Sequence, residues 1–127
     1  MKIEQATNPD VNAKVIRGYG VGYITINDDR ITTSMILTPT GLDTNWPPQA
    51  FADLTEEHCA ALLIDEPDLV LIGTGKTQRM PPPTVLAPIY RAGVGVEIMK
   101  TAAALRTFNI LTNEGRKVVA GLLIIEE

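Results

Sequence analysis

The sequence predicts a single α/β domain of three layers, with a mixed β-sheet and an N-terminal antiparallel β-hairpin. Three observations support this prediction. Two strand-like segments follow each other over residues 14–38, and helix-like and strand-like segments then alternate over residues 55–125. The chain has 127 residues, which is enough to bury one core. We therefore expect one domain over residues 1–127, without a repeat or an internal linker.

The predicted hairpin spans about residues 14–38. Residues 14–27 are rich in β-branched and aromatic side chains, and residues 30–38 continue the pattern after a turn at 27–29. Glycines at every second position from 18 to 22 remove side chains from one face of the first strand. This spacing predicts a close approach of backbone or strong coiling of the strand.

The next segment is predicted to be a loop that leads into a helix. Prolines and a glycine interrupt residues 39–54, and Trp46 within this loop is expected to plug the edge of the core. Thr55 is suited to cap the helix, because its hydroxyl can accept a hydrogen bond from a free backbone N–H group. The helix places Cys59 on its apolar side and ends before Pro67.

The rest of the chain alternates strands and helices, which favours a mixed sheet with helices packed on it. Gly93 and Gly115 suit the C-terminal ends of the two helices, and Thr101 is expected to cap the second one. The predicted segments are a strand at 68–73, a helix at 84–92, a strand at 94–99, a helix at 101–114 and a strand at 117–125.

The composition argues against several classes of function. A net charge of −4 disfavours nucleic-acid binding. The longest apolar run, residues 118–125, is too short to cross a bilayer, and the first ten residues lack the apolar core of a signal peptide. The only cysteine and histidine, Cys59 and His58, cannot complete a metal site, and as helix neighbours they point about 100° apart and cannot form a nucleophile–base pair. We expect a cytoplasmic protein without membrane insertion, metal or other cofactor.

The segment 73–77, Gly-Thr-Gly-Lys-Thr, looks like the end of a phosphate-binding P-loop, but it fails two requirements of that motif. The first glycine of the motif should stand five residues before Gly75, where the sequence has Val70. The helix whose N–H groups should hold the phosphates is replaced by prolines at 81–83, and proline has no N–H group. The sequence therefore argues against an NTPase.

A different site is predicted where two strands end. Ligands of open α/β sheets lie beyond the carboxyl ends of the strands, and the strands at 68–73 and 94–99 would end side by side if they are parallel neighbours. Residues 73–107 hold five cations and one anion, so this window carries +4 and the rest of the chain −8. The cations would converge on a crevice for a small anionic ligand, unless they belong to solvated helix faces. The residues predicted to line this crevice are Gly73, Thr74, Gly75, Lys76, Arg79, Lys100, Thr101, Arg106 and Asn109.

Several motifs occur together in the second half of the chain. A Gly-Thr-Gly strand end and a proline-led helix precede G-V-G-V-E-I-M-K-T at 93–101, R-T-F-N-I-L at 106–111 and E-G-R at 114–116. In this combination, residues 72–123 resemble the domain-of-unknown-function 498 family. Its members include assembly factor three of mitochondrial NADH:ubiquinone oxidoreductase (complex I) and an adipogenesis-associated protein. The resemblance extends weakly to the hairpin and Trp46, and it implies a compact three-layer α/β domain with a mixed sheet.

The resemblance also implies which residues occupy the motif positions of the family, and two departures limit what can be carried over. The family pattern often has a cysteine before the Arg-Thr pair and a tyrosine after it, where this chain has Leu105 and Phe108. No thiol or phenol is available there, which argues against a shared covalent mechanism. The mitochondrial member needs a presequence, which we do not expect here, so its role does not transfer automatically. The motif positions are Gly73, Gly75, Glu97, Thr101, Thr107, Asn109 and Arg116.

Glu97 is the best candidate for a general acid or base, because it interrupts an apolar strand. The structural alternative, which we favour, is a salt bridge to Lys100 or Arg106. Asn109 follows Arg106 by three residues and shares its helix face. We expect the amide of Asn109 to hold loop backbone rather than to act in catalysis.

The sequence is compatible with two functions. The first is a non-enzymatic accessory or assembly protein with a protein partner, whose apolar rim would be the prolyl loops around Trp46 and Met80. The alternative is a protein that binds a small anionic ligand, or a modest enzyme, with a crevice at Gly73–Gly75 and Glu97 as acid or base. A ligand site needs the cations and the carboxylate in one pocket, whereas an assembly surface needs a contiguous apolar patch.

Overall fold

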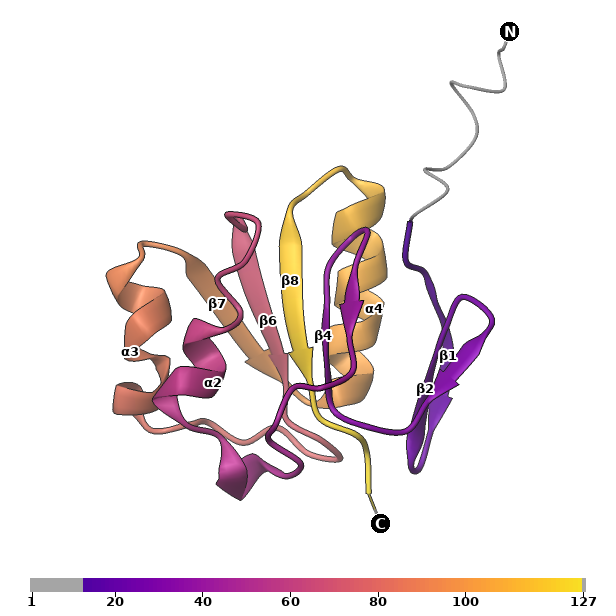
Figure 1. Cartoon of the computed structure of the whole chain (residues 1–127), viewed down its shortest axis with the longest axis horizontal. Coiled ribbons are helices and arrows are strands. Elements are labelled where there is room, and N and C mark those ends of the chain that lie inside the picture. Colours follow the sequence, from indigo (N-terminus) through magenta and orange to yellow (C-terminus); the bar gives the residue numbers. More distant parts are fainter. Residues whose placement is uncertain (1–12, 127) are drawn as a thin grey trace, which may run out of the picture.

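The computed structural model describes residues 13–126, and Figure 1 shows their arrangement. Within these residues there are a three-stranded antiparallel sheet of order β1-β2-β3 and a five-stranded mixed sheet of order β5-β4-β8-β6-β7. The strands are β1 (Ile16–Gly20), β2 (Tyr23–Ile26), β3 (Asp29–Ile31), β4 (Met35–Leu37), β5 (Leu42–Asp43), β6 (Leu69–Gly73), β7 (Gly95–Met99) and β8 (Val118–Leu122). The helices are α2 (Glu56–Ala60), α3 (Pro83–Arg91) and α4 (Thr101–Asn113), with a 3-10 helix η1 (Phe51–Asp53). Residues 1–12 and 127 of the predicted domain lie outside the described residues.

The five-stranded sheet is the middle of three layers, which confirms the predicted architecture. Helices α2 and α3 cover one face, and α4 and the three-stranded sheet lie on the other side (Figure 1). The alternation of side chains along β8 shows the division. Val118, Ala120 and Leu122 join the cluster on the α4 side, whereas Val119 joins the cluster under α2 and α3.

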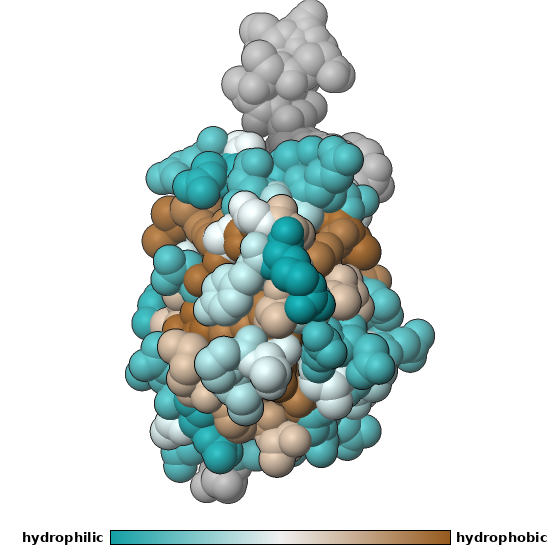
Figure 2. All heavy atoms as spheres, turned by 90° about the vertical axis from the view of Figure 1, so that its left-hand side faces the viewer, coloured by the Kyte–Doolittle hydropathy of each residue, from teal (hydrophilic) through white to brown (hydrophobic). Residues whose placement is uncertain are grey.

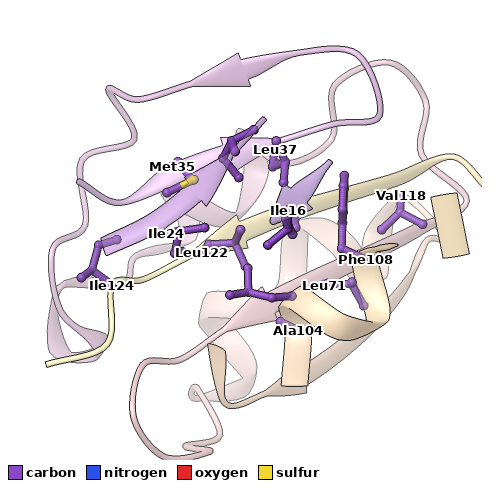
Figure 3. Close-up of a cluster of buried hydrophobic side chains, with 13 residues drawn as sticks. Ile16, Ile24, Met35, Leu37, Leu71, Ala104, Phe108, Val118, Leu122 and Ile124 are labelled. Atoms are coloured by element: carbon purple, nitrogen blue, oxygen red, sulfur yellow. The ribbon is translucent and has the colours of Figure 1, made fainter. Parts of the chain in front are cut away.

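The cluster on the α4 side joins the small sheet to the large one. Ile24 and Ile26 of β2 belong to the same buried cluster as Leu105 and Phe108 of α4. Figure 3 shows Ile24 in this cluster with Leu71 of β6 and Leu122 of β8. Full burial of one such side chain stabilises the folded state by roughly 1.5–3 kcal/mol. The apolar face of the three-stranded sheet therefore belongs to the same core as the central sheet.

The predicted hairpin is only partly correct. The turn between β2 and β3 lies where it was expected, and Thr25 pairs with Arg30 across it. The first predicted strand, however, contains a second turn that splits it into β1 and β2. Gly22 in this turn has φ of +89°, a conformation that favours glycine. The second predicted strand is interrupted at residues 32–34, and its end, β4, joins the larger sheet beside β8.

The first predicted helix begins at the expected residue but is shorter than predicted. Thr55 caps it, because the Thr55 hydroxyl accepts a hydrogen bond from the backbone N–H of His58 at 3.3 Å. The helix was expected to run up to Pro67, whereas α2 has five residues. Asp65 and Glu66 have φ values of 59° and 51°, which are left-handed and cannot continue a right-handed helix.

Trp46 closes the edge of the core, as the sequence predicts. Its side chain is only 4% exposed, and its ring N–H donates to the backbone carbonyl of His58 at 3.1 Å. The ring lies against Gly121 of β8, where a Cβ atom would be 2.6 Å from the Trp46 ring. The predicted apolar rim at Trp46 is therefore wrong, because the tryptophan is inside the fold.

Candidate functional site

The ends of β6 and β7 meet, as expected for parallel neighbours. β6 pairs in parallel with β7 on one side and with β8 on the other, so Gly73 lies opposite Met99. The backbone N–H of Thr74 donates to the carbonyl of Met99 at 2.9 Å, and that of Thr101 donates to the carbonyl of Gly75 at 2.9 Å. These three strands end at one edge of the sheet, the position where α/β folds commonly bind ligands.

Thr101 connects the ends of two of these strands. Its fully buried side chain accepts a hydrogen bond from the N–H of Gly75 at 2.8 Å and donates one to the carbonyl of Leu123 at 2.7 Å. A Cβ on Gly73 would lie 2.9 Å from the Thr101 hydroxyl oxygen, so this packing requires glycine. The prediction that Thr101 caps α4 is wrong. Lys100 takes the N-cap position, and the Thr101 hydroxyl bonds the strand ends instead.

Thr74 orders the loop that follows β6. Its buried hydroxyl donates to the carbonyl of Thr77 at 2.6 Å and accepts from the backbone N–H of Arg79 at 3.2 Å. The side-chain amide of Gln78 adds a hydrogen bond to the carbonyl of Ile98 at 2.8 Å. The chain then continues to α3, which begins at residue 83, so no helix follows the glycines directly. The loop does not have the geometry of a P-loop.

The four cations predicted to converge are distributed over different parts of the surface. Lys76 and Arg79 line one hollow of about 180 Å³ beside the end of β6. Arg106 lines another hollow, of about 150 Å³, between β1 and α4. Lys100 is exposed and lines neither of these two hollows. The predicted crevice with all four cations is therefore not formed, because α4 carries Arg106 away from the loop after β6.

Glu97 is exposed rather than buried in its strand. Its register partner on β6, Leu71, is covered by α4, but β7 is at the edge of the sheet and its outer residues face solvent. The predicted salt bridge of Glu97 is also not formed. Within residues 13–126, the ion pair present is Arg91 with Glu56, at 3.3 Å and exposed.

Asn109 holds backbone through its amide, in agreement with the structural interpretation of this residue. Its Oδ1 accepts from the N–H of Ile16 at 3.2 Å, and its Nδ2 donates to the carbonyl of the same residue at 2.9 Å. Both backbone groups of Ile16 are satisfied by one side chain. Asn109 therefore fixes β1 on α4 and is not directed at the end of the sheet.

Cys59 and His58 are not arranged as a nucleophile and its base. The Cys59 side chain is completely buried, and desolvation raises the pKa of its thiol to about 11. The Nδ1 atom of His58 accepts a hydrogen bond from the backbone N–H of Thr55 at 3.1 Å. The thiol stays protonated at neutral pH, and the imidazole completes the cap of α2.

A larger hollow, of about 420 Å³, was not predicted from the sequence. It lies between the β3–β4 connection, the loop after β5 and residues 124–126. Ser34 in its lining is 5% exposed, and within the described part of the chain its hydroxyl has no hydrogen-bond partner. The available sequence signal is two groups of small polar residues, one on each side of β4. The polar residues that line this hollow include Thr32, Thr33, Ser34, Thr44, Asn45 and Gln49.

Among residues 13–126, no helix has the length and apolar content needed to cross a bilayer. In the same part of the chain, no three His, Cys, Asp or Glu side chains are grouped so that they could hold a metal ion.

The sequence model of the family described as "Protein of unknown function (DUF498/DUF598)" matches residues 16–123. The chain belongs to this family. Members of this family are therefore the proper comparison for its fold and function. The fold agrees closely with the crystal structure of a protein from Bordetella parapertussis, with a TM-score of 0.85, 39% identity and coverage of 91% of this chain and 99% of that one.

Two curated relatives have names that refer to function or location. NADH dehydrogenase (ubiquinone) 1 alpha subcomplex assembly factor 3 of Rattus norvegicus is 34% identical over 125 residues, which cover 96% of this chain and 66% of the relative. The 13 kDa major membrane protein of Francisella tularensis is 37% identical over 65 residues, which cover 51% of this chain and 53% of the relative. The chain thus spans between about half and about two thirds of the length of these relatives.

Proposed function

We propose that this chain is a non-enzymatic accessory protein that helps to assemble a respiratory complex by binding one of its protein subunits. The observation that carries this proposal is the 34% identity to complex I assembly factor 3, which extends over 96% of the chain. A similarity of this extent includes the residues of all three layers. It is more than a shared motif at one strand end.

The distribution of reactive groups supports binding rather than catalysis. Glu97 is exposed and lines none of the hollows described above. Arg106 and Lys76 face different hollows. The thiol of Cys59 is buried and its pKa is raised to about 11, which keeps it from acting as a nucleophile. An active site would bring such groups together around one reacting atom.

The partner surface that we propose lies on α3 and on the prolyl loop before it. Met80 in this loop is 66% exposed, and Tyr90 in the last turn of α3 is 57% exposed. Figure 2 shows apolar surface on the side of the molecule that carries α3 and β7. Large apolar side chains in water favour association, because a partner removes them from solvent. Of the two prolyl loops expected to form an apolar surface for a partner, we propose only the one that contains Met80.

A deletion strain of the source organism tests the proposal. We expect native gel electrophoresis to show less assembled complex I in the strain that lacks this protein, and expression of the wild-type chain to restore it. The double variant Met80→Glu/Tyr90→Glu should fail to restore assembly, because it places two charges on the proposed surface. The control Ile110→Glu, at an exposed apolar residue of α4, should restore it. An unchanged amount of complex I in the deletion strain would overturn the proposal.

We also propose a cytoplasmic location and a partner that is a protein and not a nucleic acid. The free cysteine, Cys59, fits a reducing compartment, and the net charge of −4 opposes binding to a phosphate backbone. Cell fractionation followed by detection of the protein tests the location. Recovery in the periplasm or in a membrane fraction would contradict it.

A further inference from the structure

We propose that the chain binds a phosphate ester of a sugar or other polyol in a two-part groove at the carboxyl edge of the sheet. The proposal does not depend on the accessory role. One part of the groove is the hollow of about 420 Å³ lined by Ser34, and the other is the hollow of about 180 Å³ lined by Lys76 and Arg79. The two hollows adjoin, because both are lined by Gln49, Ile124 and Glu126.

The larger part is suited to a ligand with several hydroxyl groups. Its lining has hydroxyl and amide side chains and no cation, and such side chains both donate and accept hydrogen bonds, as sugar hydroxyls do. The carboxylate of Glu126 adds an acceptor. Its volume of about 420 Å³ lies in the range of small-molecule sites.

Ser34 is the observation that points most directly to a ligand. A buried hydroxyl without a hydrogen bond destabilises the folded protein, and a ligand that bonds it removes this cost. The Ser34 side chain is 5% exposed, lines the larger hollow and has no hydrogen-bond partner within residues 13–126. A ligand hydroxyl in the hollow would supply a hydrogen-bond partner that residues 13–126 do not provide.

The smaller part is suited to the phosphate group. Lys76 and Arg79 both line it, and the Arg79 guanidinium carbon lies 4.4 Å from the centre of the Phe51 ring. Stacking on an aromatic ring restricts the guanidinium, which can then bind two phosphate oxygens at once. Glu126 at the junction repels an anion, so the phosphate belongs at the cationic end and the hydroxyls belong next to the carboxylate.

The place of the groove in the fold agrees with this assignment. Thr74 and Gly75 follow β6 and Leu123 follows β8, and all three line the smaller hollow. The groove is therefore located beyond the carboxyl ends of parallel strands, where α/β folds bind phosphorylated ligands. Ile124, which lines both hollows, belongs to the buried core cluster and lies at one end of it in Figure 3.

Isothermal titration calorimetry of the full chain with ribose 5-phosphate tests the proposal, with ribose and inorganic phosphate as the two parts of the ligand. We expect the ester to bind at least about tenfold more tightly than either part, because only the ester uses both hollows. A titration with adenosine 5′-monophosphate shows which kind of ester the groove prefers. Tighter binding than that of ribose 5-phosphate indicates a nucleotide, and weaker binding indicates a free sugar phosphate. No binding of either ester at millimolar concentration, or equal affinity for phosphate alone, would overturn the proposal.

Two variants and one control connect the binding to the groove. Arg79→Gln removes a charge-assisted contact and should weaken binding of the ester about tenfold or more. Ser34→Ala removes a hydroxyl that has no hydrogen-bond partner within residues 13–126, so it should weaken binding without lowering the melting temperature. Arg106→Gln, in the separate hollow between β1 and α4, should leave the affinity unchanged. Equal losses in the Arg79 and Arg106 variants would show that only general charge attracts the ligand.

Discussion

Thr101 and Gly75 are joined by a buried hydrogen bond in which the N–H of Gly75 donates to the Thr101 hydroxyl at 2.8 Å. The same hydroxyl donates to the carbonyl of Leu123 at 2.7 Å, so one side chain at the start of α4 connects the ends of β6 and β8. Thr101 lines neither hollow of the proposed groove. It nevertheless bonds the backbone of Gly75 and Leu123, which line the smaller part of the groove.

The variant Thr101→Val should be clearly less stable than the wild type. Valine has the same shape but leaves the N–H of Gly75 and the carbonyl of Leu123 buried without this partner. Each unsatisfied group costs about 1–3 kcal/mol, and urea denaturation measures the sum. Thr107→Val is the control in the same helix, because within residues 13–126 the Thr107 hydroxyl makes a single weak hydrogen bond, to the sulfur of Met99 at 3.5 Å. Equal losses of stability in both variants would contradict the role of Thr101.

The variant Gly121→Ala should also be destabilised, through overpacking. A Cβ at this position would lie 2.6 Å from the Trp46 ring and 3.0 Å from the side chain of Leu62. Overpacking of a core typically costs about 1–3 kcal/mol, and Trp46 fluorescence reports the unfolding directly. In the control Gly18→Ala, the new Cβ has no atom within 4 Å. A stability loss as large in Gly18→Ala as in Gly121→Ala would rule out the proposed clash as the cause.

The variant Asn109→Leu should loosen β1 while the central sheet stays folded. The amide of Asn109 satisfies both backbone groups of Ile16 at 3.2 and 2.9 Å, and leucine cannot replace either hydrogen bond. Amide hydrogen exchange in β1 should become about tenfold faster, which corresponds to about 1.4 kcal/mol. Exchange in β6 and β8 should not change. Faster exchange in all strands would mean that Asn109 stabilises the whole fold and not one strand.

The stability of the protein should fall at high pH through Cys59. Burial raises the pKa of the folded thiol to about 11, from an ordinary value of 9.0. The unfolded chain therefore loses this proton first, and the free energy of unfolding decreases as the pH rises from about 9 to about 11. Below pH 9 the thiol is protonated in both the folded and the unfolded chain, so its contribution to the free energy of unfolding is fully present. Urea denaturation across this range should show a steeper decrease for the wild type than for Cys59→Ala. Parallel curves would contradict the prediction.

The second half of the fold could be predicted from the sequence because its signals are local and agree with one another. β6 is a continuous apolar run, which is typical of a strand covered on both faces, and the helices between the strands impose parallel order. The meeting of Gly73 and Met99 at one edge follows from that order. The first half differs, because β-branched and aromatic residues, which are typical of strands, stand on both sides of the turn at Gly22. Side chains alone did not locate that turn.

The site was less predictable because it depends on directions that the sequence does not contain. Arg106 is six residues beyond Lys100 on α4, and only the packed helix shows that it faces β1 and not the loop after β6. Thr101 has the residue type of a helix cap, but tertiary contact with β6 and β8 assigns its hydroxyl to the strand ends. Ser34 is distinguished from the neighbouring small polar residues by its burial, which depends on the packing of distant segments.

The place of β8 has a consequence for the order of folding. β8 lies between β4 and β6, although every other strand precedes it along the chain. During synthesis there are therefore two separate strand pairs, one of β4 with β5 and one of β6 with β7. The edges of β4 and β6 that later pair with β8 stay open until β8 leaves the ribosome. Open edges invite pairing with other chains, and contacts between distant residues form slowly. The nascent chain is thus most prone to aggregate before β8 inserts, and chaperone protection matters most in that interval.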